Sequence, residues 1–157
     1  MALGCGTAHI YPSGPLDELA GSRPGGRASV ANPELSEELA ILETSGVYEL
    51  VPAGHGDPVI RLEPRFTIGV CGNPILLTIV TFGLIPATVP YGSIFTYTVE
   101  APDGTVDAHV FRLSGETRIS PFQYVMGLFH SDTEALGRML ASEYAGGREL
   151  APLSQGD

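Results

Sequence analysis

The stretch SIFTYTVEAPDGTVDAHVFRL, residues 93–113, decides the fold class, because it predicts a β-hairpin. Apolar and polar residues alternate over residues 93–100, which places Phe95, Tyr97 and Val99 on one face of a strand. Asp103 and Gly104 form a strong hairpin-turn signal. Residues 106–113 are therefore expected to return as the second strand of an antiparallel pair.

The second strand of this hairpin offers two possible core faces. The two sets of alternate residues are Val106, Ala108 and Val110 on one side and Asp107, His109, Phe111 and Leu113 on the other. The first set is the cleaner one at its start, since it begins with an apolar residue and the second begins with a carboxylate. The sequence therefore favours the first set as the core face.

Two helices are predicted, one on each side of the strands along the chain. The first covers residues 33–44, with Asn32 as its N-cap and Gly46 as its stop. The second follows Ser131, which forms a capping box with Glu134, and it stops at Gly146-Gly147. Each helix has an apolar stripe, and the residues expected in the core are Leu35, Leu39, Leu42, Leu136, Met139 and Leu140.

Further strands are predicted at residues 47–51, 59–63 and 66–71. Residues 75–89, ILLTIVTFGLIPATV, form the most apolar stretch of the chain, which is too short for a membrane span of about 20 residues. Its β-branched residues favour a buried strand that ends near Ile85-Pro86. An interfacial contact with a membrane is the alternative interpretation.

The order of these elements predicts an α+β fold. We expect a single antiparallel or mixed sheet of about five strands with helices packed on one face. Residues 1–31 are expected to form a flexible N-terminal arm that acts as a tether, because Gly, Pro, Ser and Ala dominate them; only residues 27–30 could add an edge strand. The α+β domain is expected over residues 32–147 and a loose C-terminal tail over residues 148–157.

The charge of the chain limits its partners. The 157 residues include 18 acidic and 8 basic side chains, and the formal net charge is −10. The basic residues are scattered singly along the chain. No cluster of cations is therefore available for a nucleic acid or for an anionic membrane surface.

Cys5 lies in the opening residues MALGCGT, where small and apolar residues precede a cysteine and a Gly/Pro/Ser-rich stretch follows. This order resembles the end of a bacterial lipoprotein signal peptide, and the resemblance implies a processed chain that starts at Cys5 and carries a lipid there. Ala2 stands where a larger aliphatic residue is usual, and no basic or long apolar region precedes Cys5. A buried or free cysteine is the alternative. Cys71, in an apolar run, is interpreted as a buried thiol.

Two short motifs resemble a recurring pattern in bacterial envelope proteins. In the first, a helix ends in leucine, two residues and Ser-Gly, and a strand with an aromatic residue and a valine follows; the matching positions are Leu42, Ser45, Gly46, Tyr48 and Val51. The second is TFGLIP at residues 81–86, which Tyr97 and the Asp103-Gly104 turn follow. Over residues 34–144 the chain thus resembles uncharacterised bacterial envelope lipoproteins with a domain like the amino-terminal domain of the periplasmic protein TolB. The resemblance transfers no catalytic residue.

No catalytic residue, metal site or cofactor is predicted. The candidate metal ligands are His9, His55, His109 and His130, and no pair of them has the spacing of a zinc site. Motifs for an activated serine or a phosphate-binding loop do not occur. The acidic residues Glu34, Glu37 and Glu38 are interpreted as a solvated helix face. The aromatic residues Phe122, Tyr124 and Phe129 are the candidate contact for a partner or a membrane, with core packing as the alternative.

The sequence favours a lipid-anchored protein of the bacterial cell envelope that is not an enzyme and acts as a binding or assembly module. The expected location is the periplasmic face of the outer membrane. The expected partners are the membrane, through the lipid on Cys5, and an unknown envelope protein. A soluble secreted or immunity-type protein that blocks another protein is the alternative. A small metal-dependent hydrolase that uses His55, Asp57 or His109 is a further one.

Overall fold

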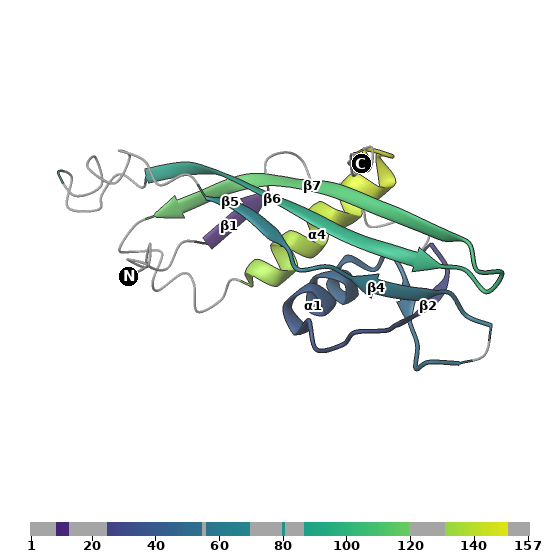
Figure 1. Cartoon of the computed structure of the whole chain (residues 1–157). Coiled ribbons are helices and arrows are strands. Elements are labelled where there is room, and N and C mark those ends of the chain that lie inside the picture. Colours follow the sequence, from purple (N-terminus) through teal and green to yellow (C-terminus); the bar gives the residue numbers. More distant parts are fainter. Residues whose placement is uncertain are drawn as a thin grey trace.

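Within the residues that the structure describes, the fold combines a curled sheet with the helices α1 and α4. A computed structural model describes residues 9–12, 25–54, 56–69, 80, 87–119 and 131–150 (Figure 1). The elements in these ranges are β1 (His9–Pro12), β2 (Arg27–Val30), α1 (Ser36–Ser45), β3 (Glu49–Leu50), β4 (Val59–Leu62), β5 (Phe66–Gly69), β6 (Ala87–Glu100), β7 (Val106–Ile119) and α4 (Asp132–Ala145).

The sheet is mixed, and its strand order is β1-β7-β6-β4-β2-β3, with β5 as a further partner of β6. β2 is parallel to β3 and β4, whereas the other pairs are antiparallel. The predicted α+β class is therefore confirmed. The expected number of about five strands is too low, because seven strands occur within the described residues.

The expected flexible arm is wrong at residues 9–12, which form β1, whereas the possible strand at residues 27–30 does form as β2. β1 pairs with β7, from His9 opposite Arg118 to Pro12 opposite Gly115. β2 lies between β4 and β3 and is not an edge strand. The side chains of Ile10 and Ala28 are buried. A few apolar residues in a Gly- and Pro-rich segment are therefore enough to form a strand where a neighbouring strand has unpaired backbone N–H and C=O groups. Residues 1–8 and 13–24 lie outside the described residues.

The hairpin of β6 and β7 is confirmed, and it is longer than predicted. The two strands pair from Ala87 opposite Ile119 to Glu100 opposite Val106. At the turn, Thr105 N donates a hydrogen bond of 2.9 Å to the side chain of Asp103. Phe95 and Tyr97 are fully buried, as their alternation predicts.

The core face of β7 is the one that the sequence did not favour. Phe95 lies opposite Phe111 and Ser93 opposite Leu113, and residues opposite each other in an antiparallel pair share a face. Phe111 and Leu113 are accordingly buried, whereas Val106 is 60% exposed. The register that the turn imposes on the whole strand thus outweighs the apolar residue at its start.

β4 and β5 follow each other along one edge of β6, where β4 pairs with residues 97–100 and β5 with residues 91–94. Pro64 lies between them and has no N–H for a ladder. Arg65 N donates a 3.0 Å hydrogen bond to Glu38 Oε1, and the Arg65 guanidinium lies 3.5 Å from Glu37 Oε2. Glu38 is buried, which corrects its expected position on a solvated helix face: a backbone N–H compensates this carboxylate.

The start of α1 differs from the prediction, because Asn32 is not its N-cap. The Asn32 side chain instead donates to Leu62 O over 2.8 Å and accepts from Leu62 N over 2.9 Å. α1 therefore begins at Ser36 and not at residue 33. The predicted stop is confirmed: Gly46 has a φ of 64°, a left-handed conformation that favours glycine.

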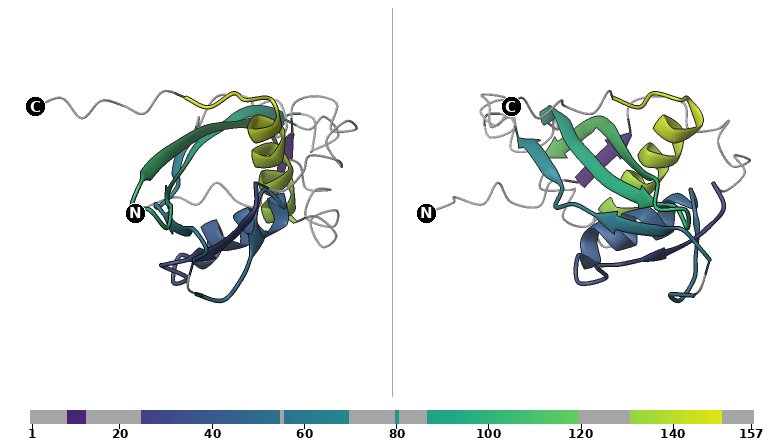
Figure 2. Two further views of the ribbon diagram at one scale, coloured as in Figure 1. Left: turned by 90° about the vertical axis from the view of Figure 1, so that its right-hand side faces the viewer. Right: turned by 45° about the vertical axis from the view of Figure 1, so that its right-hand side comes forward.

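α4 begins and ends as predicted. Ser131 Oγ accepts a hydrogen bond of 3.3 Å from Glu134 N, and Gly146 follows the last helical residue. Leu136, Met139 and Leu140 are buried. α4 packs against α1, and Figure 2 shows the sheet curling around both helices. The core therefore lies between the concave face of the sheet and the two helices.

The expected loose tail is wrong at its start. Leu150 N donates to Val110 O over 2.8 Å, and Glu149 forms an isolated bridge with Phe111. These bonds occupy backbone groups on the edge of β7 that β1 does not reach. Residues 151–157 lie outside the described residues.

The predicted buried strand over residues 75–86 is wrong at Val80. Val80 has a helical conformation and is 70% exposed. The central positions of the sheet are occupied by β6 and its partners. Residues 70–79 and 81–86 lie outside the described residues, and residues 87–89 belong to β6.

Candidate functional site

Most of the predicted site residues lie outside the described residues. These are Cys5, His55, Phe122, Tyr124, Phe129 and His130. The backbone of His9 lies in β1, and Asp57 lies in the turn before β4. His109 lies on β7, and the structure gives its contacts. The candidate site is therefore built around His109.

His109 belongs to a group of packed aromatic side chains, named here the aromatic cluster. Its members are Tyr48, Tyr97, His109, Phe111 and Tyr144. The Tyr97 ring stacks on His109 with centroids 5.0 Å apart and on Phe111 at 6.0 Å. Tyr48 meets Tyr97 edge-on at 6.1 Å and Tyr144 at 6.2 Å. The aromatic cluster therefore joins β6, β7, α4 and the segment between α1 and β3.

Glu149 brings a carboxylate to the rim of the aromatic cluster. His109 Nδ1 lies 3.0 Å from Glu149 Oε1. The bridge between Glu149 and Phe111 positions this carboxylate from the backbone. This bridge and the hydrogen bond from Leu150 N to Val110 O hold the segment after α4 against the edge of β7.

Two phenols of the aromatic cluster resist ionisation. Burial raises the pKa of Tyr48 to about 12, and the neighbouring Tyr144 adds to the rise. Burial also raises the pKa of Tyr97 far above its ordinary value, and Tyr48 adds to this rise. Both phenols therefore keep their protons to a higher pH than an exposed tyrosine does.

The free energy of unfolding should fall as the pH rises above about 10. An unfolded tyrosine loses its proton near pH 10, whereas folded Tyr48 keeps its proton to about pH 12. The unfolded chain then binds fewer protons, which lowers stability by at most about 1.4 kcal/mol per pH unit for each retained proton, and by less at the partly exposed Tyr48. Urea unfolding at a series of alkaline pH values measures this slope. The pKa of Tyr97 is also raised by burial, so Tyr97→Phe should make the slope less steep. An equally steep slope in that variant would contradict the raised pKa of Tyr97.

The members of the aromatic cluster contact one another through their rings. Within the ranges that the structure describes, no group of three or more His, Cys, Asp or Glu side chains could hold a metal ion. None of the described helices is long and apolar enough to cross a membrane. The ring contacts of the aromatic cluster hold together β6, β7, α4 and the segment between α1 and β3.

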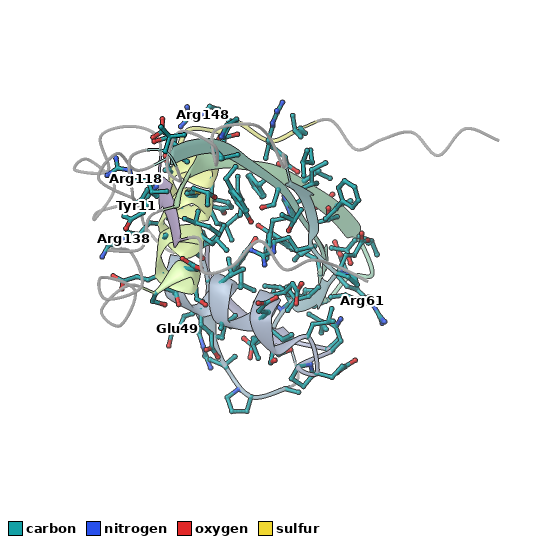
Figure 3. All side chains as sticks on the ribbon, turned by 90° about the vertical axis from the view of Figure 1, so that its left-hand side faces the viewer. Tyr11, Glu49, Arg61, Arg118, Arg138 and Arg148 are labelled. Carbon is teal, nitrogen blue, oxygen red and sulfur yellow. The ribbon has the colours of Figure 1, made fainter. Side chains whose placement is uncertain are left out.

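A second candidate site is the end of the sheet where β1 begins, named here the β1 end. His9 lies opposite Arg118, and Arg118 lies opposite Thr88 of β6. The Arg118 guanidinium lies 4.8 Å from the centre of the Tyr11 ring, a cation–π distance (Figure 3). β1 is therefore held at this end by backbone pairing and by a side-chain contact.

The β1 end lies close along the chain to the predicted lipidation residue. Cys5 precedes His9 by four residues. A fully extended chain of four residues spans at most about 14 Å. Ile10 N also donates a 3.0 Å hydrogen bond to Asp132 Oδ1 at the start of α4. The connection from Cys5 to the folded domain is thus short.

No protein-family model matches the chain, and no curated protein matches it. The solved structures that are similar to it include two bacterial lipoproteins. A minor lipoprotein from Acinetobacter baumannii is 12% identical over 78% of this chain and 94% of that protein, with a TM-score of 0.43. The rare lipoprotein B from Shewanella oneidensis is 13% identical over 78% of this chain and 96% of that protein, with a TM-score of 0.42. A likeness this weak assigns neither a family nor a role to this chain, and the expected likeness to TolB stays a prediction.

Proposed function

We propose that this chain is a lipid-anchored protein of the bacterial cell envelope. The observation that carries the proposal is the position of Cys5. It lies between small apolar residues and a Gly/Pro/Ser-rich stretch, four residues before a strand that is paired in the sheet. A lipid on Cys5 would thus be connected to the domain by a short segment. Each buried CH₂ of such a lipid contributes about 0.8 kcal/mol to membrane binding.

The proposed role is non-enzymatic binding or assembly at the periplasmic face of the outer membrane. The aromatic cluster supports this role, because its rings are packed against one another and against the core. The proposed partner is another envelope protein. Phe122, Tyr124 and Phe129 remain the proposed contact residues for this partner or for the membrane.

Cys5→Ser should release the protein from the membrane. The full-length protein, made in a bacterium with its native upstream region, is expected to partition into detergent and to carry a lipid on Cys5 in its mass spectrum. Cys5→Ser removes the thiol that would carry the lipid, so this variant should move to the aqueous phase. Cys71→Ser is the matched control and should partition like the wild type. Equal partitioning of the Cys5→Ser variant and the wild type would refute the lipid anchor.

A further inference from the structure

Between Arg65 and Glu100 the chain contains no acidic, basic or histidine residue. This uncharged segment starts with β5 and ends within β6. Soluble domains carry a charged side chain at about one position in four. A segment of this length without charge is therefore unusual for a surface that faces only water.

The outer face of β5 is apolar and exposed. Phe66 is 66% exposed and Ile68 is 42% exposed. Their partners in β6, Ile94 and Gly92, alternate with the buried Phe95, so Phe66 and Ile68 point away from the core. Phe66 and Ile68 together are named here the β5 apolar face. Exposed apolar side chains gathered on one face mark an interaction site.

The β5 apolar face lies toward the β1 end of the sheet. β5 runs toward this end, because Gly69 pairs with Tyr91 while Phe66 pairs further along β6. The chain leaves the sheet after Gly69 and returns to it at Ala87, the first residue of β6. Val80 lies between these two points in the sequence, and it is 70% exposed.

The anchor and the β5 apolar face are within reach of the same surface. Ile68 lies opposite Gly92, which is four residues along β6 from Thr88. Thr88 belongs to the row of the sheet that contains His9, the start of β1. Four residues of a strand span about 13 Å, which is similar to the greatest distance between Cys5 and His9. A lipid on Cys5 would therefore hold this end of the sheet at the bilayer.

We propose that the β5 apolar face rests in the interface of a zwitterionic lipid bilayer, as a second membrane contact beside the lipid. The proposal rests on the proposed anchor at Cys5, which sets the position of the membrane. The net charge of −10 opposes an anionic surface, so the contact depends on burial of apolar side chains.

The surroundings of the β5 apolar face suit the interface of a bilayer. Arg112 lies opposite Ile94 on the same outer face and is exposed. Arg118, over the Tyr11 ring, is exposed at the β1 end. Arginine and tyrosine at the edge of an apolar patch suit the headgroup region, because they bury an apolar stem or ring and keep a polar tip in water.

A single introduced tryptophan tests the contact directly, because the chain has no tryptophan of its own. Phe66→Trp is made in the Cys5→Ser background and mixed with phosphatidylcholine vesicles. We expect its emission to shift to the blue and lipids with brominated acyl chains to quench it. Val106→Trp is the matched control, since Val106 is also exposed but lies at the turn end of the hairpin. Its emission should not change.

Vesicle flotation measures how much the contact contributes. In the same Cys5→Ser background, Phe66→Asp and Ile68→Asp should each lower the partition coefficient by about tenfold, the effect of one large apolar side chain that is no longer buried. Val106→Asp should leave it unchanged. All three residues are exposed, so the variants should unfold at the wild-type temperature, and lost binding would not reflect lost folding.

Three outcomes would overturn the proposal. The first is Phe66→Trp emission that vesicles leave unchanged. The second is an equal loss of binding in Val106→Asp. The third is a dimer that Phe66→Asp dissociates, which would assign the β5 apolar face to a second copy of the chain. All of these measurements use the Cys5→Ser protein, which carries no lipid. They can therefore refute the membrane contact of β5 without refuting the lipid anchor, which the detergent partitioning tests separately.

Discussion

Replacing Gly137 by valine should lower the free energy of unfolding by about 3 kcal/mol or more. A Cβ at Gly137 would lie 2.9 Å from Thr44 Cβ and 3.0 Å from Ser45 N, where α4 crosses the end of α1. The obstacle includes backbone, so the two helices would have to separate and expose part of the core between them. Valine has a better helix propensity than glycine, so any loss comes from packing. Urea unfolding monitored by circular dichroism measures the change.

Arg138→Val is the matched control for this experiment. Arg138 is the next residue of α4, is exposed, and pairs with Glu134 one turn earlier. Losing an exposed pair of this kind costs about 0.3–0.5 kcal/mol, and valine adds a propensity cost of a few tenths. The control should therefore lose less than about 1 kcal/mol. Similar stability of the Gly137→Val and Arg138→Val variants would contradict the close approach of the helices.

Phe111→Ala should have an effect of comparable size, a loss of about 3–5 kcal/mol. Phe111 is 1% exposed, and its ring lies 6.0 Å from that of Tyr97 and 6.2 Å from that of Tyr144. Removing it leaves a cavity in the aromatic cluster where β7 meets α4. Such a loss approaches the whole stability of many domains, so thermal unfolding of the soluble fraction is the practical measurement.

Two further variants separate the cavity from other causes. Phe111→Leu keeps most of the apolar volume, so it should lose clearly less than Phe111→Ala. Val110→Ala, at the next position of β7, changes a residue on the outer face and should cost little. A small loss in Phe111→Ala, no greater than that in Val110→Ala, would mean that this face of β7 is not the core.

Local signals predicted the turn of the hairpin and the ends of the helices. The Asp103-Gly104 turn, the stop at Gly46 and the cap at Ser131 each depend on contacts within about four residues of the chain. A backbone conformation or a hydrogen bond of this range is determined by the residues that make it. The sequence therefore suffices for such features.

Pairing between distant segments could not be predicted in this way. β1 and residues 149–150 pair with free backbone groups of β7, and β2 pairs with those of β4. Nothing in the sequences of these three segments identifies their partners. Asn32 shows the same limit. It suits an N-cap, but in the folded chain its amide makes two hydrogen bonds with the backbone of Leu62, thirty residues away.

Part of the aromatic cluster could have been predicted from the sequence. Tyr97 lies on the predicted core face of β6, and counting back from the Asp103-Gly104 turn places His109 opposite it. This register would have chosen the correct face of β7. Tyr48 and Tyr144 join the cluster from elements whose packing only the three-dimensional structure gives.

The docking of β1 has a consequence for the order of events in an exported protein. Ile10 N donates a hydrogen bond to Asp132, 122 residues later in the chain, and among the described strands β1 pairs with β7 alone. A chain that emerges from a translocation channel with its N-terminus first has no site for β1 until β7 and α4 have followed. On the proposed route, Cys5 would thus stay accessible to a modifying enzyme during the whole transit. The arrival of α4, which lets β1 dock, would end that period. Attachment of the lipid to Cys5 would therefore precede the completion of folding.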